Sequence, residues 1–182
     1  LATNHLISLG HRRIGTITTP MSRRVTHSRL EGYRRALATA GIPYTPDRVE
    51  EGGLAVEEGY DATYRLLKRA PDITAIFVHT DTMAVGVLSA LHDLKRHVPG
   101  DCAVVGCDDV PFAAHLIPPL TTVRVPFYET GETAMRLLLD IIADPSREVQ
   151  RILLPVSLIV RASCGSTSLP TAERRTSGQD LN

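Results

Sequence analysis

Short apolar runs alternate with amphipathic stretches along the first two thirds of the chain. In the amphipathic stretches, apolar or small side chains recur at spacings of three and four residues, which places them on one helix face. These stretches predict helices at residues 1–10, 27–40, 56–70 and 82–94. The apolar runs predict strands at residues 14–18, 74–78 and 102–105, and another within residues 118–123. A further short strand is predicted at residues 48–51, between the helix at 27–40 and Gly52-Gly53. A regular alternation of strand and helix predicts an α/β fold with a mostly parallel sheet and helices on both faces.

The rhythm changes after residue 123. One more helix is predicted at residues 130–142, the pair Asp144-Pro145 breaks it, and an extended segment follows at residues 152–160. Residues 164–182 are dominated by serine, threonine, glycine, arginine and proline, so they have little to bury. We expect this tail to be disordered.

Composition excludes several classes of protein. Of the 182 residues, 43% are hydrophobic, enough for a true core, and the formal net charge is zero with the arginines scattered. Scattered charge gives no electrostatic footprint for nucleic acid, so we expect no DNA contact by this stretch itself. No apolar stretch approaches the roughly 20 residues of a membrane span, and the first residues lack a signal layout. The cysteines are odd in number and lack metal spacing, which fits reduced thiols in a cytoplasmic protein: Cys102, Cys107 and Cys164.

The most informative run is Val104-Val105-Gly106-Cys107-Asp108-Asp109, an apolar strand that ends in two carboxylates. In open α/β sheets, ligands bind at the carboxyl ends of the strands, so Asp108 is a candidate ligand residue. The alternative is that one of the two aspartates caps a short helix near residues 110–114.

Catalysis has no comparable argument. Cys107 with His115 as its base would be a conceivable nucleophile, but a thiol packed as a small hydrophobic side chain is the commoner state. We find no glycine-rich phosphate loop, no zinc-protease motif and no nucleophile elbow, and the histidines do not cluster at ligand spacing. The sequence therefore predicts no enzyme activity, no metal and no cofactor.

Six segments in order resemble the bacterial lactose/galactose repressor family over residues 1–163. They are the segments at residues 10–14, 29–37, 81–86, 98–109, 118–123 and 154–163. The resemblance implies a regulator with a helix-turn-helix, a hinge helix and a two-lobed effector domain shaped like periplasmic sugar-binding proteins. It assigns residues 1–13 and 125–145 to the first lobe and residues 14–124 and 146–163 to the second. The chain would cross between lobes near Arg13, Val125 and Ser146, and the DNA-binding domain would lie outside this stretch.

The resemblance also implies effector-binding residues. Arg29 and Asp108 would hold effector hydroxyl or carboxylate oxygens, and the alternative is that they pair only with each other. Arg23 matches a loop position that contacts the effector in some members. Thr80 stands where many relatives carry an asparagine, and a hydroxyl replaces only part of an amide's donor and acceptor set. Leu54 falls where some relatives place a stacking aromatic, which makes a purine effector a poorer fit.

Two further expectations concern the helix at residues 82–94. Asp81 is expected to cap it. The helix is unusually apolar for a surface helix, so one side would cover the sheet and the other would meet a second copy of the chain. The predicted homodimer surface consists of Val85, Leu88, Phe112, Leu116 and Ile117. The alternative is a helix buried wholly within its own domain.

Together these observations predict the small-molecule sensing domain, for a sugar or related polyhydroxy compound, of a cytoplasmic transcription regulator. It would touch DNA only through a helix-turn-helix outside this stretch, and it would not contact a membrane. The first alternative is a solute-binding protein of a sugar transport system, which shares the fold and the cleft. The second is an enzyme that uses Asp108, Asp109 and either Cys107 or His115.

Overall fold

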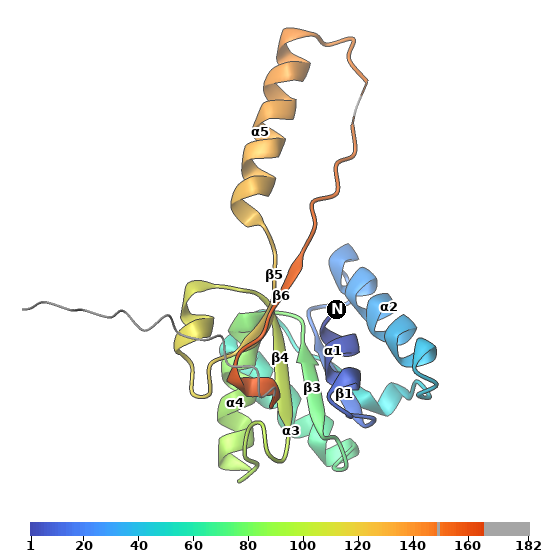
Figure 1. Cartoon of the computed structure of the whole chain (residues 1–182), viewed down its shortest axis with the longest axis vertical. Coiled ribbons are helices and arrows are strands. Elements are labelled where there is room, and N and C mark those ends of the chain that lie inside the picture. Colours follow the sequence, from blue (N-terminus) through green and yellow to red (C-terminus); the bar gives the residue numbers. More distant parts are fainter. Residues whose placement is uncertain (149, 166–182) are drawn as a thin grey trace, which may run out of the picture.

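The computed structural model describes residues 1–148 and 150–165, and it confirms the predicted α/β fold with a mostly parallel sheet. Six strands lie in the order β2-β1-β3-β4-β5-β6 (Figure 1). They are β1 (Ile14–Thr18), β2 (Val49–Glu51), β3 (Ala75–Val78), β4 (Ala103–Asp108), β5 (Thr121–Arg124) and β6 (Ser157–Ile159). The first five are parallel, and β6 alone pairs antiparallel, against β5.

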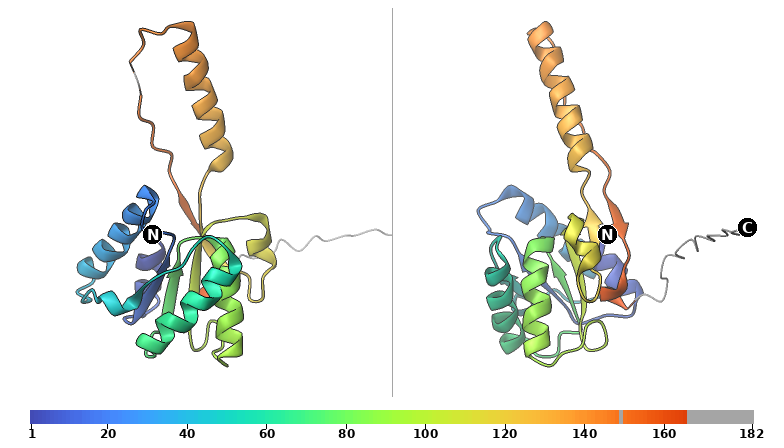
Figure 2. Two further views of the ribbon diagram at one scale, coloured as in Figure 1. Left: turned by 180° about the vertical axis from the view of Figure 1, so that it is seen from behind. Right: turned by 90° about the vertical axis from the view of Figure 1, so that its left-hand side faces the viewer.

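Helices cover both faces of this sheet, as predicted (Figure 2). Helices α1 (Ala2–Ser8) and α2 (Arg24–Thr39) pack on one face, and α3 (Val56–Arg69) and α4 (Asp81–Asp93) pack on the other. Two apolar clusters result, one on each side of the strands, because successive strand side chains point to opposite faces. The periodic residues Leu30, Tyr33 and Leu37 of α2 are all buried, as their spacing predicts.

Helices α3 and α4 approach each other unusually closely. A Cβ placed on Gly86 of α4 would lie 1.9 Å from the Val56 carbonyl oxygen, and one on Gly59 of α3 would lie 2.3 Å from the Met83 carbonyl oxygen. The absence of a side chain at both positions lets the two backbones touch. Much of the apolar surface of α4 is therefore covered within the domain, by the sheet and by α3. This packing favours the alternative that the helix is buried in its own domain.

Helix α1 belongs to the body around the sheet. Ala2 and Leu6 are buried in the same cluster as Leu30 and Phe77. The assignment of residues 1–13 to another lobe is therefore wrong, because α1 covers apolar sheet surface that would otherwise face water. The expected crossing near Arg13 is wrong as well, because this residue precedes β1 at the amino end of the strands, whereas α5 leaves from the carboxyl ends (Figure 1).

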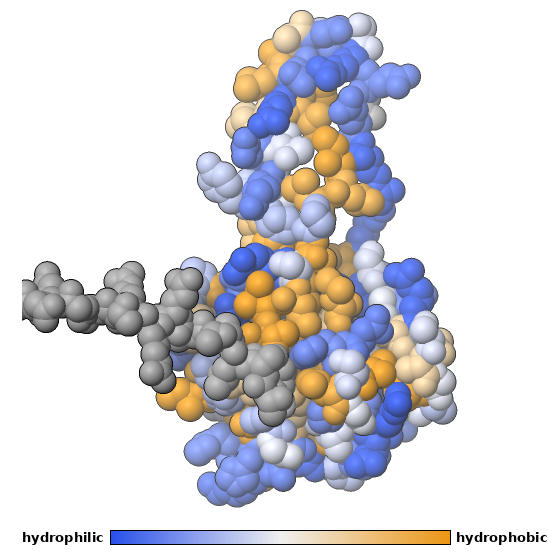
Figure 3. All heavy atoms as spheres, in the orientation of Figure 1, coloured by the Kyte–Doolittle hydropathy of each residue, from blue (hydrophilic) through white to orange (hydrophobic). Residues whose placement is uncertain are grey.

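Helix α5 (Phe127–Ala143) extends away from the body, and the returning chain runs back beside it to β6 (Figures 1 and 2). It begins three residues before the predicted start, and none of its residues is buried. Apolar side chains gather along this arm and at its base (Figure 3). The large exposed ones on the arm are Phe127, Tyr128, Met135, Leu138, Leu139, Ile141, Ile142, Ile152, Leu153 and Val156. An arm with so much exposed apolar surface agrees with the expectation that residues 125–145 pack in another lobe, which stays a prediction.

The remaining boundaries differ by a few residues. Helix α2 begins at Arg24, three residues early, because Thr26 ties the first turn down by donating to the Pro20 carbonyl oxygen at 3.0 Å. The last strand covers only residues 157–159 of the predicted 152–160. The expected disordered tail does not begin at residue 164, because Cys164 closes a 3-10 helix and is only 1% exposed. The rest of that expectation falls on residues 166–182, outside the described residues.

Candidate functional site

The candidate residues gather at one edge of the sheet. Arg23 lies in the loop after β1, Leu54 follows β2, Thr80 follows β3 and Asp108 ends β4. Because β1 to β4 are parallel, all four positions lie at the carboxyl ends of the strands, on the side from which α5 leaves (Figure 1). The fold therefore brings the candidate residues together at the sheet edge where they were predicted to lie.

Arg29 and Asp108 form the centre of the site. The Arg29 Nη2 atom lies 3.5 Å from Asp108 Oδ1, and Arg29 Nη1 donates to the His79 carbonyl oxygen. The two side chains are 21% and 18% exposed. A charge-assisted hydrogen bond usually measures about 2.7 to 2.9 Å, so this ion pair is loose. A ligand that enters from solvent can therefore displace this contact and bind both side chains through its own oxygens or hydroxyl groups.

Burial raises the pKa of Asp108 to about 6, with the nearby Asp81 carboxylate adding to the rise and Arg29 opposing it. A carboxylate with incomplete solvation gains more from each donor that reaches it. Asp108 is thus suited to accept hydrogen bonds from ligand hydroxyl groups.

The backbone of the turn directs the two aspartates to different sides. Asp108 and Asp109 have φ angles of 127° and 57°, both in a region that residues other than glycine rarely adopt. The next short helix, a 3-10 turn at Pro111–His115, begins after Val110 and has no side-chain cap. The alternative that either aspartate caps this helix is therefore wrong.

Asp109 was considered as a helix cap or as part of an enzyme site, and the structure gives it two arginine partners instead. Its Oδ2 atom lies 2.6 Å from Arg124 Nε, and its Oδ1 atom lies 2.7 Å from Arg161 Nη2. Burial pushes the pKa of Asp109 upward, but the hydrogen bonds and charges of both arginines outweigh it and hold the pKa below its ordinary value. The sequence offered one signal for this pairing, the arginine in the closing segment at residues 154–163.

Asp81 does not cap α4, contrary to the prediction. Thr80 is the cap, and its hydroxyl accepts from the Met83 N–H at 3.2 Å. Asp81 is fully buried behind the turn, where its carboxylate accepts from the Thr122 hydroxyl at 2.6 Å and the Val110 N–H at 3.1 Å. The carboxylate comes close to the backbone of β4, because a Cβ on Gly106 would lie 2.2 Å from Asp81 Oδ1.

The other predicted ligand residues lie at the edge without reaching the Arg29–Asp108 pair. Thr80 is half-buried and uses its hydroxyl for the cap. Arg23 is exposed beside α2, and Leu54 is 41% exposed with its N–H bound to Glu58. Among residues 1–148 and 150–165, none of the three makes a hydrogen bond or ion pair with Arg29 or Asp108. Their role as ligand residues remains a prediction.

His79 is a residue of this site that sequence reasoning missed. Its side chain is fully buried, and within the described part of the chain neither ring nitrogen has a hydrogen-bond partner. Burial, with the positive charge of Arg29, lowers the pKa of His79 to about 3, so the ring is neutral. It packs on the Phe77 ring with centroids 5.1 Å apart. Only its place after a buried strand could have pointed to it.

A cavity of about 550 Å³ adjoins the pair and has mostly apolar walls. Arg29 and Cys107 line it together with Leu1 at the start of the chain and Val125 and Val156 at the two ends of the arm. Burial raises the pKa of Cys107 to about 12, so this thiol stays protonated, and His115 lies in the 3-10 helix. The arrangement gives no support to Cys107 as a nucleophile.

In the described ranges, no three histidine, cysteine, aspartate or glutamate side chains are placed to hold a metal ion. Within the same ranges, no helix combines the length and apolarity that a membrane crossing requires.

The chain is similar to a known protein family, to curated proteins and to solved structures. Residues 3–164 match the family model of a periplasmic binding protein-like domain. The ribose operon repressor of Escherichia coli strain K12 is 42% identical over 164 residues, which cover 90% of this chain and 49% of the repressor. A solved structure of the transcriptional regulator CelR in complex with cellobiose is 42% identical, with a TM-score of 0.86, and the match covers 89% of this chain and 50% of that one. A LacI-family regulatory protein from Chloroflexus aggregans is 38% identical with a TM-score of 0.82, over 89% of this chain and 58% of that one.

The chain spans about half the length of the curated relatives it matches. About half of each relative therefore has no counterpart in residues 1–182, and the activity of the whole relative depends on those segments as well. The matches support the architecture. They also show that the proteins sharing it at this level of identity are regulators of transcription rather than enzymes.

Proposed function

Because the chain belongs to the family of periplasmic binding protein-like domains, in the form found in LacI-family regulators, we propose that it senses a small molecule and alters the DNA affinity of a transcription regulator. DNA contact is assigned to a helix-turn-helix outside this stretch. The ligand is bound and not transformed. Binding shifts the population between open and closed arrangements of two lobes, because the ligand has different affinities for the two.

The observation that carries this proposal is the Arg29–Asp108 pair at the carboxyl edge of the sheet. The pair combines a planar guanidinium with five donors and a carboxylate with only acceptors. A polyhydroxy compound offers adjacent oxygens that can accept from the first and donate to the second. Since the pair is loose and about one-fifth exposed, a ligand can take up both groups without breaking a short ion pair.

The proposed ligand class is a sugar. One relative is a repressor of a ribose operon, and a solved relative is a complex with cellobiose, and each matches nine-tenths of this chain. Leu54 offers no aromatic face for a purine ring at the position where the resemblance places one, which further favours a sugar over a nucleobase.

Regulation is favoured over solute transport by the relatives, which are named as regulators and operon repressors. The buried, protonated thiols of Cys102 and Cys107 fit the cytoplasmic location that such a regulator needs. An enzyme is disfavoured, because Cys107 remains protonated in an apolar wall.

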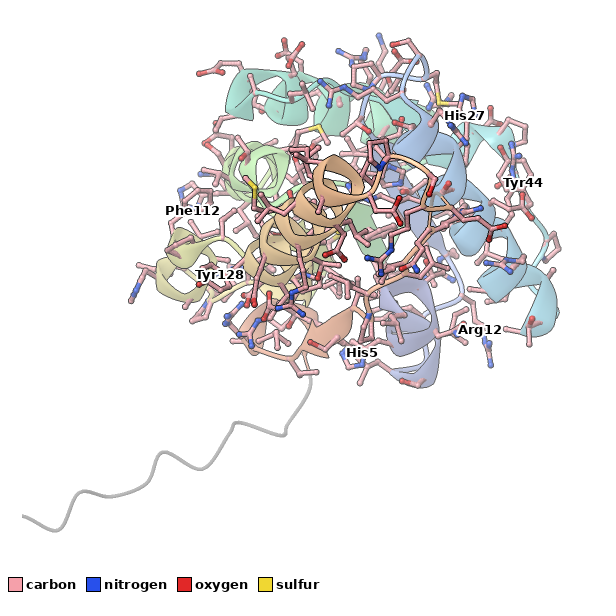
Figure 4. All side chains as sticks on the ribbon, turned by 90° about the horizontal axis from the view of Figure 1, so that it is seen from above. His5, Arg12, His27, Tyr44, Phe112 and Tyr128 are labelled. Atoms are coloured by element: carbon pink, nitrogen blue, oxygen red, sulfur yellow. The ribbon has the colours of Figure 1, made fainter. Side chains whose placement is uncertain are left out.

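A homodimer completes the proposal. Ile117 is 95% exposed and Phe112 is 42% exposed, an unusual state for such large apolar side chains. Val85, Leu88 and Leu116 are each partly buried, and Leu88 and Leu116 pack against the core beneath α4. Seen from above, Phe112 lies at the side of the molecule opposite His27 of α2, so a partner there would leave the α2 side of the site open (Figure 4).

The test is ligand-induced stabilisation of the protein encoded by the complete gene. Thermal unfolding is followed with cellobiose, ribose, other mono- and disaccharides, and nucleosides as separate probes. A ligand present at a hundred times its dissociation constant adds about 2.7 kcal/mol to the free energy of unfolding, a clearly measurable shift. Asp108→Asn and Arg29→Gln should each abolish the response.

Glu132→Gln is the matched control, because it removes a carboxylate from an exposed ion pair with Arg136 on α5, away from the sheet edge. It should respond to the sugar as the wild type does. A sugar response that survives both site substitutions would show that the site lies elsewhere, and the absence of any response to sugars would refute the proposed ligand class.

A further inference from the structure

The two neighbouring carboxylates of the strand-end turn contact different parts of the molecule. Asp108 faces Arg29 on α2, which belongs to the ligand site. Asp109 faces Arg124 and Arg161, which lie on the chain segments that connect the body to the α5 arm. A single peptide bond joins the two aspartates, so a backbone shift at one of them displaces the other.

Arg124 stands at the root of the arm, whereas Arg161 lies past the other end of β6, beside the start of β5. Arg124 is the last residue of β5, directly before the chain leaves the sheet, and its register partner is Ser157, the first residue of β6. Arg161 follows β6 by two residues, and its other terminal nitrogen donates to the Leu120 carbonyl oxygen at 2.8 Å. The Asp109 carboxylate therefore bridges the outgoing and the returning strand.

The contacts on the two sides differ in strength. The Asp109 side chain is 6% exposed and makes ion pairs of 2.6 and 2.7 Å, one through each oxygen. The Asp108 pair is longer, at 3.5 Å, and the Asp108 side chain, at 18%, is three times as exposed as that of Asp109. A ligand would therefore displace the Arg29–Asp108 contact first. The resulting shift of the turn would then reach β5 and β6 through the shorter ion pairs of Asp109.

The turn itself is suited to move as a unit. Two successive residues with positive φ store backbone strain that only surrounding contacts hold in place. On one side this support is the Asp81 carboxylate, which accepts from the Val110 N–H, and on the other it is the pair of arginines. Because a few specific contacts hold the turn, the loss of one of them can shift it to a second conformation. A segment with two such conformations is what coupling between two sites requires.

We propose that Asp109 is the residue that couples the ligand site to the arm, by tying the Asp108 turn to Arg124, at the arm end of β5, and to Arg161, which anchors the other end of β6. Asp109 is thus a positioning residue, and Asp108 is the ligand residue. The inference rests on the proposed function, because a coupling residue serves a protein whose ligand changes the placement of the arm.

The first test needs no ligand. Hydrogen exchange is measured by mass spectrometry on the protein from the complete gene, for peptides spanning residues 121–128 and 153–161. Asp108→Asn weakens the contact with Arg29, and we expect at least a threefold change in the exchange rates of both peptides. In the Asp109→Asn background, the same substitution should change neither. Additive effects of the two substitutions, or no effect of Asp108→Asn on these peptides, would overturn the proposal.

The second test adds whichever sugar stabilises the wild-type protein. Asp109→Asn should bind that sugar within about threefold of the wild type while the peptides at the roots of the arm no longer respond to it. Loss of affinity equal to that of Asp108→Asn would instead make Asp109 part of the binding site and contradict the coupling role. If the wild type binds no sugar, the proposed function fails, and the ligand-free comparison still decides the role of Asp109.

Two further variants protect the result. Glu132→Gln removes an ion-paired carboxylate from α5 itself and should leave exchange at the roots of the arm unchanged. If Asp109→Asn does not fold, Arg124→Gln takes its place, because this arginine is 55% exposed and its loss leaves Asp109 paired with Arg161.

Discussion

The buried Asp81 carboxylate accepts a 2.6 Å hydrogen bond from the buried Thr122 hydroxyl, and this contact joins the start of α4 to β5 behind the ligand turn. Asp81→Ala would leave that hydroxyl and the Val110 N–H without an acceptor in a dry environment. We expect the free energy of unfolding to fall by about 3 kcal/mol, measured by urea denaturation. Asp101→Ala is the control, because this exposed carboxylate accepts one N–H, from His97, and its loss should cost about 1 kcal/mol or less.

Sugar binding should weaken as the pH falls. The ionised form of Asp108 accepts hydrogen bonds from hydroxyl groups, and burial raises its pKa to about 6. At pH 7.5 the group is ionised, whereas at pH 5 about nine-tenths of it carries a proton, so affinity should drop about tenfold between these values. Titration calorimetry across this range checks the prediction. Any residual binding by Asp108→Asn should not show this drop, and an unchanged wild-type affinity at pH 5 would contradict the role of its carboxylate.

Two glycine substitutions on helices should have opposite effects. Gly86→Ala places a methyl group 1.9 Å from the Val56 carbonyl oxygen, so α3 and α4 must separate, and we expect a loss of about 2 kcal/mol or more. Gly32→Ala on α2 meets no atom within 4 Å and should stabilise the protein by about 0.5 to 1 kcal/mol. Thermal unfolding of both variants beside the wild type measures the contrast. Equal effects would mean that the helix contact is looser than the structure indicates.

Replacing His79 should change how stability depends on pH. The unfolded chain protonates this histidine near pH 6.5, whereas burial lowers the pKa in the folded protein to about 3. Its contribution to stability is therefore complete above pH 6.5 and declines as the pH falls, by about 1.4 kcal/mol per unit. His79→Phe removes a ring whose nitrogens lack partners and should show a smaller decline between pH 7 and 5 in urea unfolding. The exposed His27→Gln controls for removal of an imidazole, and parallel pH profiles of His79→Phe and wild type would contradict the prediction.

The homodimer prediction depends on Ile117 and Phe112. Placing a carboxylate on this exposed apolar surface, as Ile117→Glu or Phe112→Glu, should shift the protein from dimer to monomer, because an unpaired charge cannot be buried at an interface. Sedimentation velocity at several concentrations provides the measurement. Val25→Glu is a control on another exposed apolar side chain and should stay dimeric. Dimers that persist in both interface variants would place the contact elsewhere.

The fold could be predicted because local patterns and global arrangement agree. Helix α3 has the predicted start and ends within one residue of the predicted end, and the spacing of Leu30, Tyr33 and Leu37 identified the buried face of α2. The location of α1 could not be predicted in this way. Nothing in residues 1–13 says which sheet face Leu6 covers, since that depends on long-range packing.

The site was predictable in part for the same reason. Asp108 follows an apolar strand and so had to lie at the sheet edge, and the resemblance supplied Arg29. The prediction for Asp81 was wrong, because a carboxylate at a helix start ordinarily serves as a cap. Its inward orientation depends on long-range contacts with Thr122, Val110 and the backbone at Gly106, which the local sequence does not show. The pairing of Asp109 with Arg161 joins residues 52 positions apart, a separation that no local pattern encodes.

The antiparallel pairing of β6 with β5 gives the body a topology that protein engineers can use. Residues 122, 123 and 124 pair in register with residues 159, 158 and 157, so in connectivity the whole arm is the loop of an oversized β-hairpin. Such a loop can be excised and its ends joined by a two-residue turn such as Asn-Gly, which suits the twist of adjacent antiparallel strands. The product would be a minimal scaffold that keeps Arg29, Asp108 and both faces of the sheet, and onto which a different reporting element could be grafted at the same two strand ends.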